Sequence, residues 1–97
     1  MIDVRLYNFI NYKEFINEWI KSLPKNGRGK YLEIATELNA HTTLISQIFK
    51  GERDLSMEQA FQLCDYLGFN KLETDYFILL VSKERSGNFQ LKEYYQN

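Results

Sequence analysis

The chain has 97 residues, of which 44% are apolar and 26% are charged, and its formal net charge is −1. This length and composition are typical of one globular domain and exclude disordered and low-complexity chains. A single cysteine and a single histidine exclude an internal disulfide and the common zinc sites. The longest apolar run, residues 76–81, is far shorter than the roughly 20 residues that a membrane helix needs. We therefore expect a cytoplasmic protein that has no membrane segment, metal or cofactor.

Residues 1–10 are expected to form an N-terminal arm, in which the alternation over 2–6 is typical of a short edge strand or an extended segment. Apolar side chains then recur at helical spacing and predict a helix over 12–23 with one buried face. Asn11 is placed to cap its start, and Pro24 ends it because the residue before a proline disfavours the helical region. The buried face is expected to consist of Tyr12, Phe15, Ile16, Trp19, Ile20 and Leu23. Its aromatic rings are predicted to belong to the core and not to a platform for stacked bases.

Two short helices follow a glycine-containing loop. The loop, 24–29, has two glycines that suit positive φ angles. Helices are predicted over 30–38 and 42–50, each with its apolar side chains on one face. Asn39 suits the left-handed conformation that ends a helix, and Gly51 is placed to end the next one.

Two further helices complete the predicted domain. Ser56 and Gln59 form a capping box for the fourth helix, and Asn70 with Glu73 opens a fifth over 71–84.

The predicted fold is all-α, a compact bundle of five short helices, or of six if the segment 88–95 is helical. The domain is expected to span 11–86. The remaining segment, 87–97, is expected to be an interface or the start of a further domain.

The segment from Lys30 to Asp54 carries the most information about function. It has two short helices separated by about three residues, with the small Ala35 where the helices approach. This spacing is typical of a helix-turn-helix, whose second helix enters the major groove of DNA. The segment resembles the helix-turn-helix of Cro and phage-repressor regulators (XRE-type, lambda repressor-like). The matched positions are Ile34-Ala35, Leu38-Asn39, Ile45-Ser46, Ile48 and Gly51.

The wider chain is similar, over about residues 5–86, to one family of bacterial regulators. In that family a unit like this one is N-terminal, and a longer C-terminal domain of unknown function follows it. The similarity is carried by Phe9-x-x-Tyr12-Lys13-x-Phe15, by Gly51-x-Arg53-x-Leu55-Ser56 and by Tyr76-Phe77 leading into Leu79-Leu80-Val81. It implies a role in transcription regulation, and it suggests that the chain is a fragment or a short relative.

Two positions depart from the phage-repressor pattern. Asn39 stands where a glycine is usual, and we expect the turn to survive because asparagine tolerates the left-handed conformation. His41 stands where serine or a similar cap is usual, so Thr42 or Thr43 is expected to take the cap instead.

In a helix that enters the major groove, the N-terminal residues meet the base edges first. The resemblance places Thr42, Thr43 and Gln47 at base-reading positions, and Ser46 is a weaker candidate. A glutamine can bond to both N6 and N7 of adenine, and a threonine methyl can contact the methyl of thymine.

Phosphate contacts are expected from residues around the motif, where positive charge is concentrated. Residues 24–53 include five basic and three acidic side chains, a net of +2, whereas 54–97 include four basic and seven acidic, a net of −3. The resemblance places Tyr31 and Lys50 at phosphate-contacting positions. The full set of candidates is Lys25, Arg28, Lys30, Tyr31, His41, Lys50 and Arg53. Five neutralised phosphates predict that log K falls against log salt with a slope of roughly −4 to −5.

Each of these interpretations has a purely structural alternative. Helix-turn-helix spacing is also a simple way to pack short helices, the basic loop can be merely solvated, and His41 can be a surface turn residue. Cys64 lies on the buried face of its helix and is expected to be inert packing. Nothing in the sequence places a base against a nucleophile, and no glycine-rich phosphate loop follows a strand, so we do not expect an enzyme.

The apolar run 76–81 predicts more apolar surface than one core can bury, because six helical residues span more than a full turn. An exposed apolar patch on a helix usually marks an interface. The candidate interface residues are Phe77, Ile78, Val81, Phe89 and Tyr94, for a homodimer or for a further domain. Residues 2–6 are another candidate for that contact. The alternative is that the C-terminal tail folds back and covers the helix.

The sequence therefore predicts sequence-specific binding of double-stranded DNA in bacterial transcription regulation. A homodimer would read two half-sites about one helical turn apart. The alternative is a protein–protein interaction module that has the same fold and does not bind DNA. The net charge of −1 and the unusual cap residue at position 41 favour that alternative.

Overall fold

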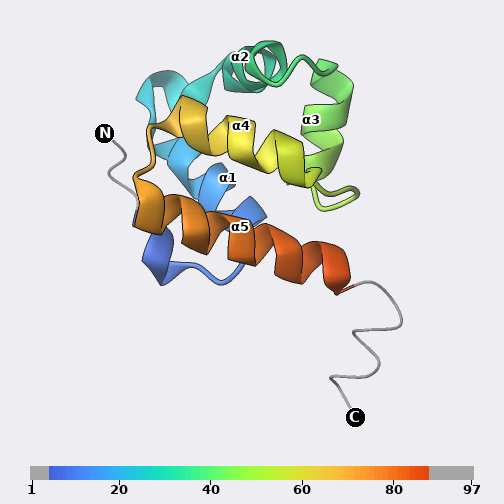
Figure 1. Ribbon diagram of the computed structural model, residues 1–97. Coiled ribbons are helices and arrows are strands. Elements are labelled where there is room, and N and C mark those ends of the chain that lie inside the picture. The colour runs from blue at the N-terminus through green and yellow to red at the C-terminus, as the bar shows by residue number, and fades with distance from the viewer. Residues whose placement is uncertain (1–4, 88–97) are drawn as a thin grey trace.

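The computed structural model describes residues 5–87 of the chain, and within them all regular structure is helical. The fold class is therefore all-α, as predicted, and five α-helices form a compact bundle (Figure 1). The helices are α1 (Tyr12–Ser22), α2 (Lys30–Glu37), α3 (Thr42–Phe49), α4 (Met57–Leu67) and α5 (Lys71–Ser86), with short 3-10 turns η1 (Leu6–Asn8) and η2 (Pro24–Gly27). None of the described helices is both long and apolar enough to cross a membrane. The possible sixth helix at 88–95 lies outside the described residues.

Three polar side chains start helices where the sequence predicts them. The Asn11 side chain accepts from the backbone N–H groups of Lys13 and Glu14, at 2.8 and 3.2 Å. Ser56 and Asn70 each form a complete capping box with the residue three positions later. These bonds are local, so the helix starts follow directly from the sequence.

The ends of four helices differ from the prediction by one or two residues, and α2 and α3 each end one residue earlier, at Glu37 and Phe49. α1 ends at Ser22 because Leu23, which precedes Pro24, takes an extended conformation. α5 continues two residues beyond the predicted end, to Ser86.

The turns on either side of α2 contain left-handed residues. Asn39 has φ of 52°, which confirms that asparagine can occupy the usual glycine position of this turn. Lys25 and Asn26 are also left-handed, in addition to the two glycines of their loop. Gly27 is required there because a Cβ atom would lie 2.4 Å from the Ile20 side chain and 2.6 Å from its carbonyl oxygen.

The centre of the bundle is aromatic. α1 packs against α3 and α5, and α4 packs against α2 and α5. The rings of Tyr12 and Phe15 lie 5.7 and 6.4 Å from that of Phe77, and Phe69 closes the cluster. Trp19 is also buried, which confirms that the aromatic stripe belongs to the core. Cys64 is 2% exposed, and burial raises the pKa of its thiol to about 11, as expected for inert packing.

Two predictions about surface contacts need correction, one for the N-terminal segment and one for α5. Leu6 is buried in the core within η1 and is not part of an edge strand, while residues 1–4 lie outside the described residues. Phe77 and Val81 are fully buried and therefore cannot form an exposed interface, and Ile78 is packed partly against the core. The exposed apolar side chains of α5 are instead Leu72 and Leu79, at 71% and 62%. The reason is the periodicity of the helix: residues four positions apart, such as 77 and 81, lie on the same face, and here that face packs against the core.

Candidate nucleic-acid interface

α2 and α3 are joined by the tight turn at residues 38–41 and pack directly against each other. In Figure 1, α2 lies along the top of the view and α3 runs steeply down from its end. The inner face of α3 is buried through Ile45, Ile48 and Phe49. Its outer face is left to solvent.

The outer face of α3 carries the predicted base-reading residues. Thr42 and Thr43 are exposed, and Ser46 and Gln47 are half-buried. Within residues 5–87 none of these four side chains makes a hydrogen bond, so their polar groups are uncommitted. His41 is exposed beside them.

The start of α3 differs from the prediction that a threonine caps it. The helix begins at Thr42, and the cap position is occupied by His41, whose side chain makes no capping hydrogen bond. Thr42 and Thr43 are therefore already inside the first turn. Their hydroxyls are not used to hold the end of the helix, and they stay available on the surface.

Four predicted phosphate contacts are exposed cations. Lys25, Arg28, Lys50 and Arg53 all reach solvent. No ion pair joins any of them to another described residue. They lie in the loop before α2, at the end of α3 and in the loop that follows it.

Lys30 differs from those four because its charge is already matched. Its ammonium forms an ion pair with Glu33, donates to the Tyr66 hydroxyl at 3.1 Å and lies 5.5 Å from the centre of the Trp19 ring. The hydrogen bond from Lys30 lowers the pKa of Glu33, and the same bond raises the pKa of Lys30. Tyr66 also donates to the Glu33 carboxylate. Sequence spacing indicates the Lys30–Glu33 pair, but Tyr66 is far away in the chain and only the fold places it there.

Tyr31 is the second predicted phosphate contact that is engaged inside the protein. Its ring stacks on Phe49 with 6.1 Å between ring centres, and its hydroxyl donates to the Asn17 side chain at 3.2 Å. The Asn17 amide in turn donates to the carbonyl of Phe49 at 2.8 Å. Partial burial raises the pKa of Tyr31. Tyr31 therefore ties α2 to α1 and α3, and sequence reasoning did not identify Asn17 as its partner.

A hollow of about 420 Å³ separates the start of α2 from the start of α3. Its lining includes Asn26, Gly29, Lys30, Tyr31 and Thr42. Gly29 stands at the cap position of α2 and supplies no side chain to its first N–H groups. Free N–H groups at a helix start favour an anion.

The loop after α3 is held by α1. Leu55 N–H donates to the Tyr12 hydroxyl at 3.0 Å, and that hydroxyl lies 3.2 Å from an Asp54 carboxylate oxygen. The Lys13 ammonium donates to the Arg53 carbonyl at 2.6 Å and pairs with Asp54 at 3.0 Å. These contacts fix where α3 ends relative to α1. Sequence reasoning assigned Tyr12 to the core and missed its polar role.

Within residues 5–87, no three histidine, cysteine, aspartate or glutamate side chains gather as metal ligands. No family model, curated protein or solved structure matches the chain. A function for this protein therefore has to follow from the geometry of this surface and the chemistry of its side chains.

Proposed function

We propose that the protein binds double-stranded DNA with α3 in the major groove. The observation that carries this proposal is the outer face of α3. Three of its side chains, Thr42, Thr43 and Gln47, can exchange hydrogen bonds with base edges and have no partner among the described residues. The uncommitted Lys50 follows directly at the end of the same helix.

The cations near α3 and the start of α2 are suited to contact the phosphate backbone of DNA. Lys25 and Arg28 lie in the loop that leads into α2, whose first N–H groups face no side-chain cap. Phosphate contacts of this kind fix the register of a protein on the duplex, and base contacts then read the sequence.

The proposal extends to transcription regulation in a bacterial cytoplasm, which the resemblance to phage-repressor regulators implies. In such proteins the second helix of the pair reads the bases. A single module of this size covers few base pairs, so two copies related by two-fold symmetry would be needed for a long operator.

The first test is fluorescence anisotropy with mixed-sequence duplex DNA at about 50 and 200 mM salt, a range over which multi-phosphate binding weakens strongly. Four exposed cations without ion-pair partners predict a slope of about −3 to −4 for log K against log salt, since each neutralised phosphate contributes about −0.9. This is shallower than the sequence alone suggests, because Lys30 is paired with Glu33.

Lys50→Ala should weaken binding to every DNA sequence and reduce the salt slope by about 1. The matched control is Lys71→Ala, on α5, because Lys71 is paired with Asp75 and lies away from α3. Absence of binding at the lower salt concentration, by a protein shown to be folded, would contradict the proposal.

The second candidate function is a protein–protein interaction module. The observation that favours it is the exposure of four large apolar side chains on the N-terminal segment and α5, here called the apolar surface: Tyr7, Ile10, Leu72 and Leu79 are each more than half exposed. The ring of Tyr7 lies 5.2 Å from that of Tyr76 on α5, so this surface joins the N-terminal segment to α5. A folded protein that fails to bind DNA and associates through this surface would support this candidate.

A further inference from the structure

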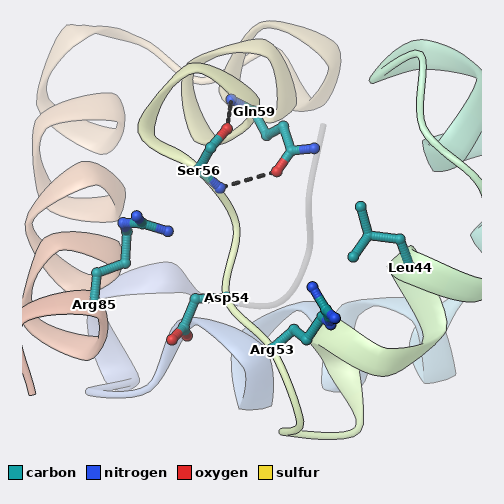
Figure 2. A pocket seen from close by; sticks show the side chains of 6 residues that line it. All are labelled: Leu44, Arg53, Asp54, Ser56, Gln59 and Arg85. Carbon is teal, nitrogen blue, oxygen red and sulfur yellow. Dashed lines mark hydrogen bonds between the residues drawn. The ribbon is translucent and has the colours of Figure 1, made fainter. Parts of the chain in front are cut away.

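A second hollow, of about 390 Å³, lies beside the loop between α3 and α4 (Figure 2). Its lining comes from four elements: α3, the loop that follows it, α4 and α5. The lining residues are Leu44, Arg53, Asp54, Ser56, Gln59 and Arg85.

Two guanidinium groups from separate parts of the chain face this hollow. Arg53, in the loop after α3, has no hydrogen-bond or ion-pair partner for its guanidinium among residues 5–87. Arg85, on α5, donates one N–H to the carbonyl of Leu55 at 2.9 Å. That bond holds the side chain against the loop and leaves its other N–H groups available. In Figure 2 the two side chains reach toward the hollow from opposite sides of Asp54.

The uncharged polar side chains of the lining, Ser56 and Gln59, form the capping box of α4, in which the Ser56 hydroxyl oxygen accepts from the Gln59 N–H at 3.0 Å. The Gln59 side-chain oxygen accepts from the N–H of Ser56 at 2.9 Å, which leaves the Gln59 amide NH₂ free (Figure 2). The hollow lies at the start of α4, where the helix dipole also favours an anion.

The one carboxylate in the lining is already neutralised. An oxygen of Asp54 pairs with the Lys13 ammonium at 3.0 Å and lies 3.2 Å from the Tyr12 hydroxyl. The charge of Asp54 is thus matched by Lys13, and among the described residues no carboxylate forms an ion pair with either arginine.

We infer that this hollow binds a phosphate group, with Arg53 and Arg85 as its two cations. Guanidinium groups bind phosphate oxygens in pairs of parallel hydrogen bonds, and such charge-assisted bonds are the stronger kind. The phosphate can come from a phosphate-bearing small molecule or from the DNA backbone, and only the second source rests on the proposed function. Because Arg85 belongs to α5, occupancy by either source would link α5 to the loop that ends α3.

The test is a titration of the isotope-labelled chain with inorganic phosphate at constant ionic strength, followed by the backbone and arginine side-chain N–H resonances. We expect saturable shifts at residues 53–59 and at the Arg85 side chain. Arg85→Gln and Arg53→Gln should each weaken binding about tenfold or more, because a hydrogen bond to a charged group is lost. Arg53→Gln is informative even if Arg85→Gln disturbs the loop, since the Arg53 guanidinium holds no other described residue. Arg5→Gln, an exposed arginine outside both the hollow and the predicted DNA contacts, is the control and should bind phosphate as the parent does.

A parallel DNA titration of the same variants separates the two sources. Saturable phosphate binding with DNA affinity unchanged in Arg85→Gln supports a small-molecule ligand, and it does so even if the parent protein does not bind DNA. If both arginine variants are folded and both lose DNA affinity, the phosphate that the hollow binds belongs to the DNA backbone. The inference is overturned if chloride produces the same shifts as phosphate and Arg85→Gln does not alter DNA affinity.

Discussion

Gln47 is the residue on α3 whose side chain is best suited to distinguish one base from another. Its amide can donate and accept at once, as adenine requires, and no described residue competes for it. The Gln47 side chain is half-buried, so part of it packs against its neighbours and part of it reaches solvent.

Gln47→Ala should therefore relax the sequence preference by about 1–3 kcal/mol at one base pair and leave binding to mixed-sequence DNA nearly unchanged. The measurement compares the affinities for a selected operator and for its single-base variants. Gln62→Ala, at an exposed position of α4, serves as the control. An unchanged preference in the Gln47 variant would remove this residue from the base-reading set.

Glu33 controls how much of the Lys30 charge is available to a ligand. The carboxylate holds the Lys30 ammonium in an ion pair and also accepts from the Tyr66 hydroxyl. A phosphate that approaches the start of α2 must therefore compete with Glu33 for Lys30.

Glu33→Gln should release Lys30, strengthen DNA binding at low salt and make the salt slope steeper by about 1. Glu37→Gln removes an equal charge from an exposed position in the same helix and provides the control, because Glu37 makes no described ion pair. If both variants have the same effect, the cause is overall charge and not the release of Lys30.

At the scale of elements, the loop between α3 and α4 depends on one buried hydroxyl. Tyr12 is fully buried, and its hydroxyl serves both the N–H of Leu55 and the side chain of Asp54. Burial and the nearby Asp54 charge both raise the pKa of this tyrosine, so it stays protonated and keeps its bond to the carboxylate.

Tyr12→Phe should lower the free energy of unfolding by about 1–3 kcal/mol, because the buried N–H of Leu55 loses its partner. Urea unfolding measures the loss, and hydrogen exchange at Leu55 locates it. Tyr7→Phe is the matched control, since Tyr7 is 56% exposed and a surface change of this kind is usually within about 0.5 kcal/mol. Equal stability of the two variants would show that the Tyr12 hydroxyl does not hold the loop.

At the scale of the whole molecule, the described surface has two faces to which we assign a proposed function. One is the outer face of α3 with its cations, and the other is the apolar surface of the N-terminal segment and α5. Pairing of two copies through the apolar surface would give a two-fold dimer, and a two-fold dimer of DNA-binding modules reads a palindromic operator.

Leu79→Glu should therefore shift the protein toward the monomer, because it places a charge in the middle of the apolar surface. Size-exclusion chromatography with light scattering, over a range of concentrations, reads the change directly. Leu32→Glu provides the control, since Leu32 on α2 is 61% exposed and Leu79 is 62% exposed. A parent protein that stays monomeric at high concentration would contradict pairing and favour a different partner for this surface.

The sequence by itself determined the helices, because their signals act over a few residues. Asn11, Ser56 and Asn70 bond to N–H groups no more than three residues away, and Asn39 adopts its left-handed turn without help from distant parts of the chain. The aromatic stripe of α1 likewise identified core residues, since helical periodicity is itself local.

The tertiary structure alone decided which side chains are free and which are engaged. Tyr66 reaches Lys30 across 36 positions, and the Tyr12 hydroxyl reaches Leu55 across 43. The way α5 packs against α1 buries Phe77 and leaves Leu79 exposed, although both belong to the same apolar run in the sequence. The hollow that joins Arg53 to Arg85 exists only because the loop after α3 packs beside α5. Spacing along the chain carries no information about such contacts, because they depend on how the helices pack together.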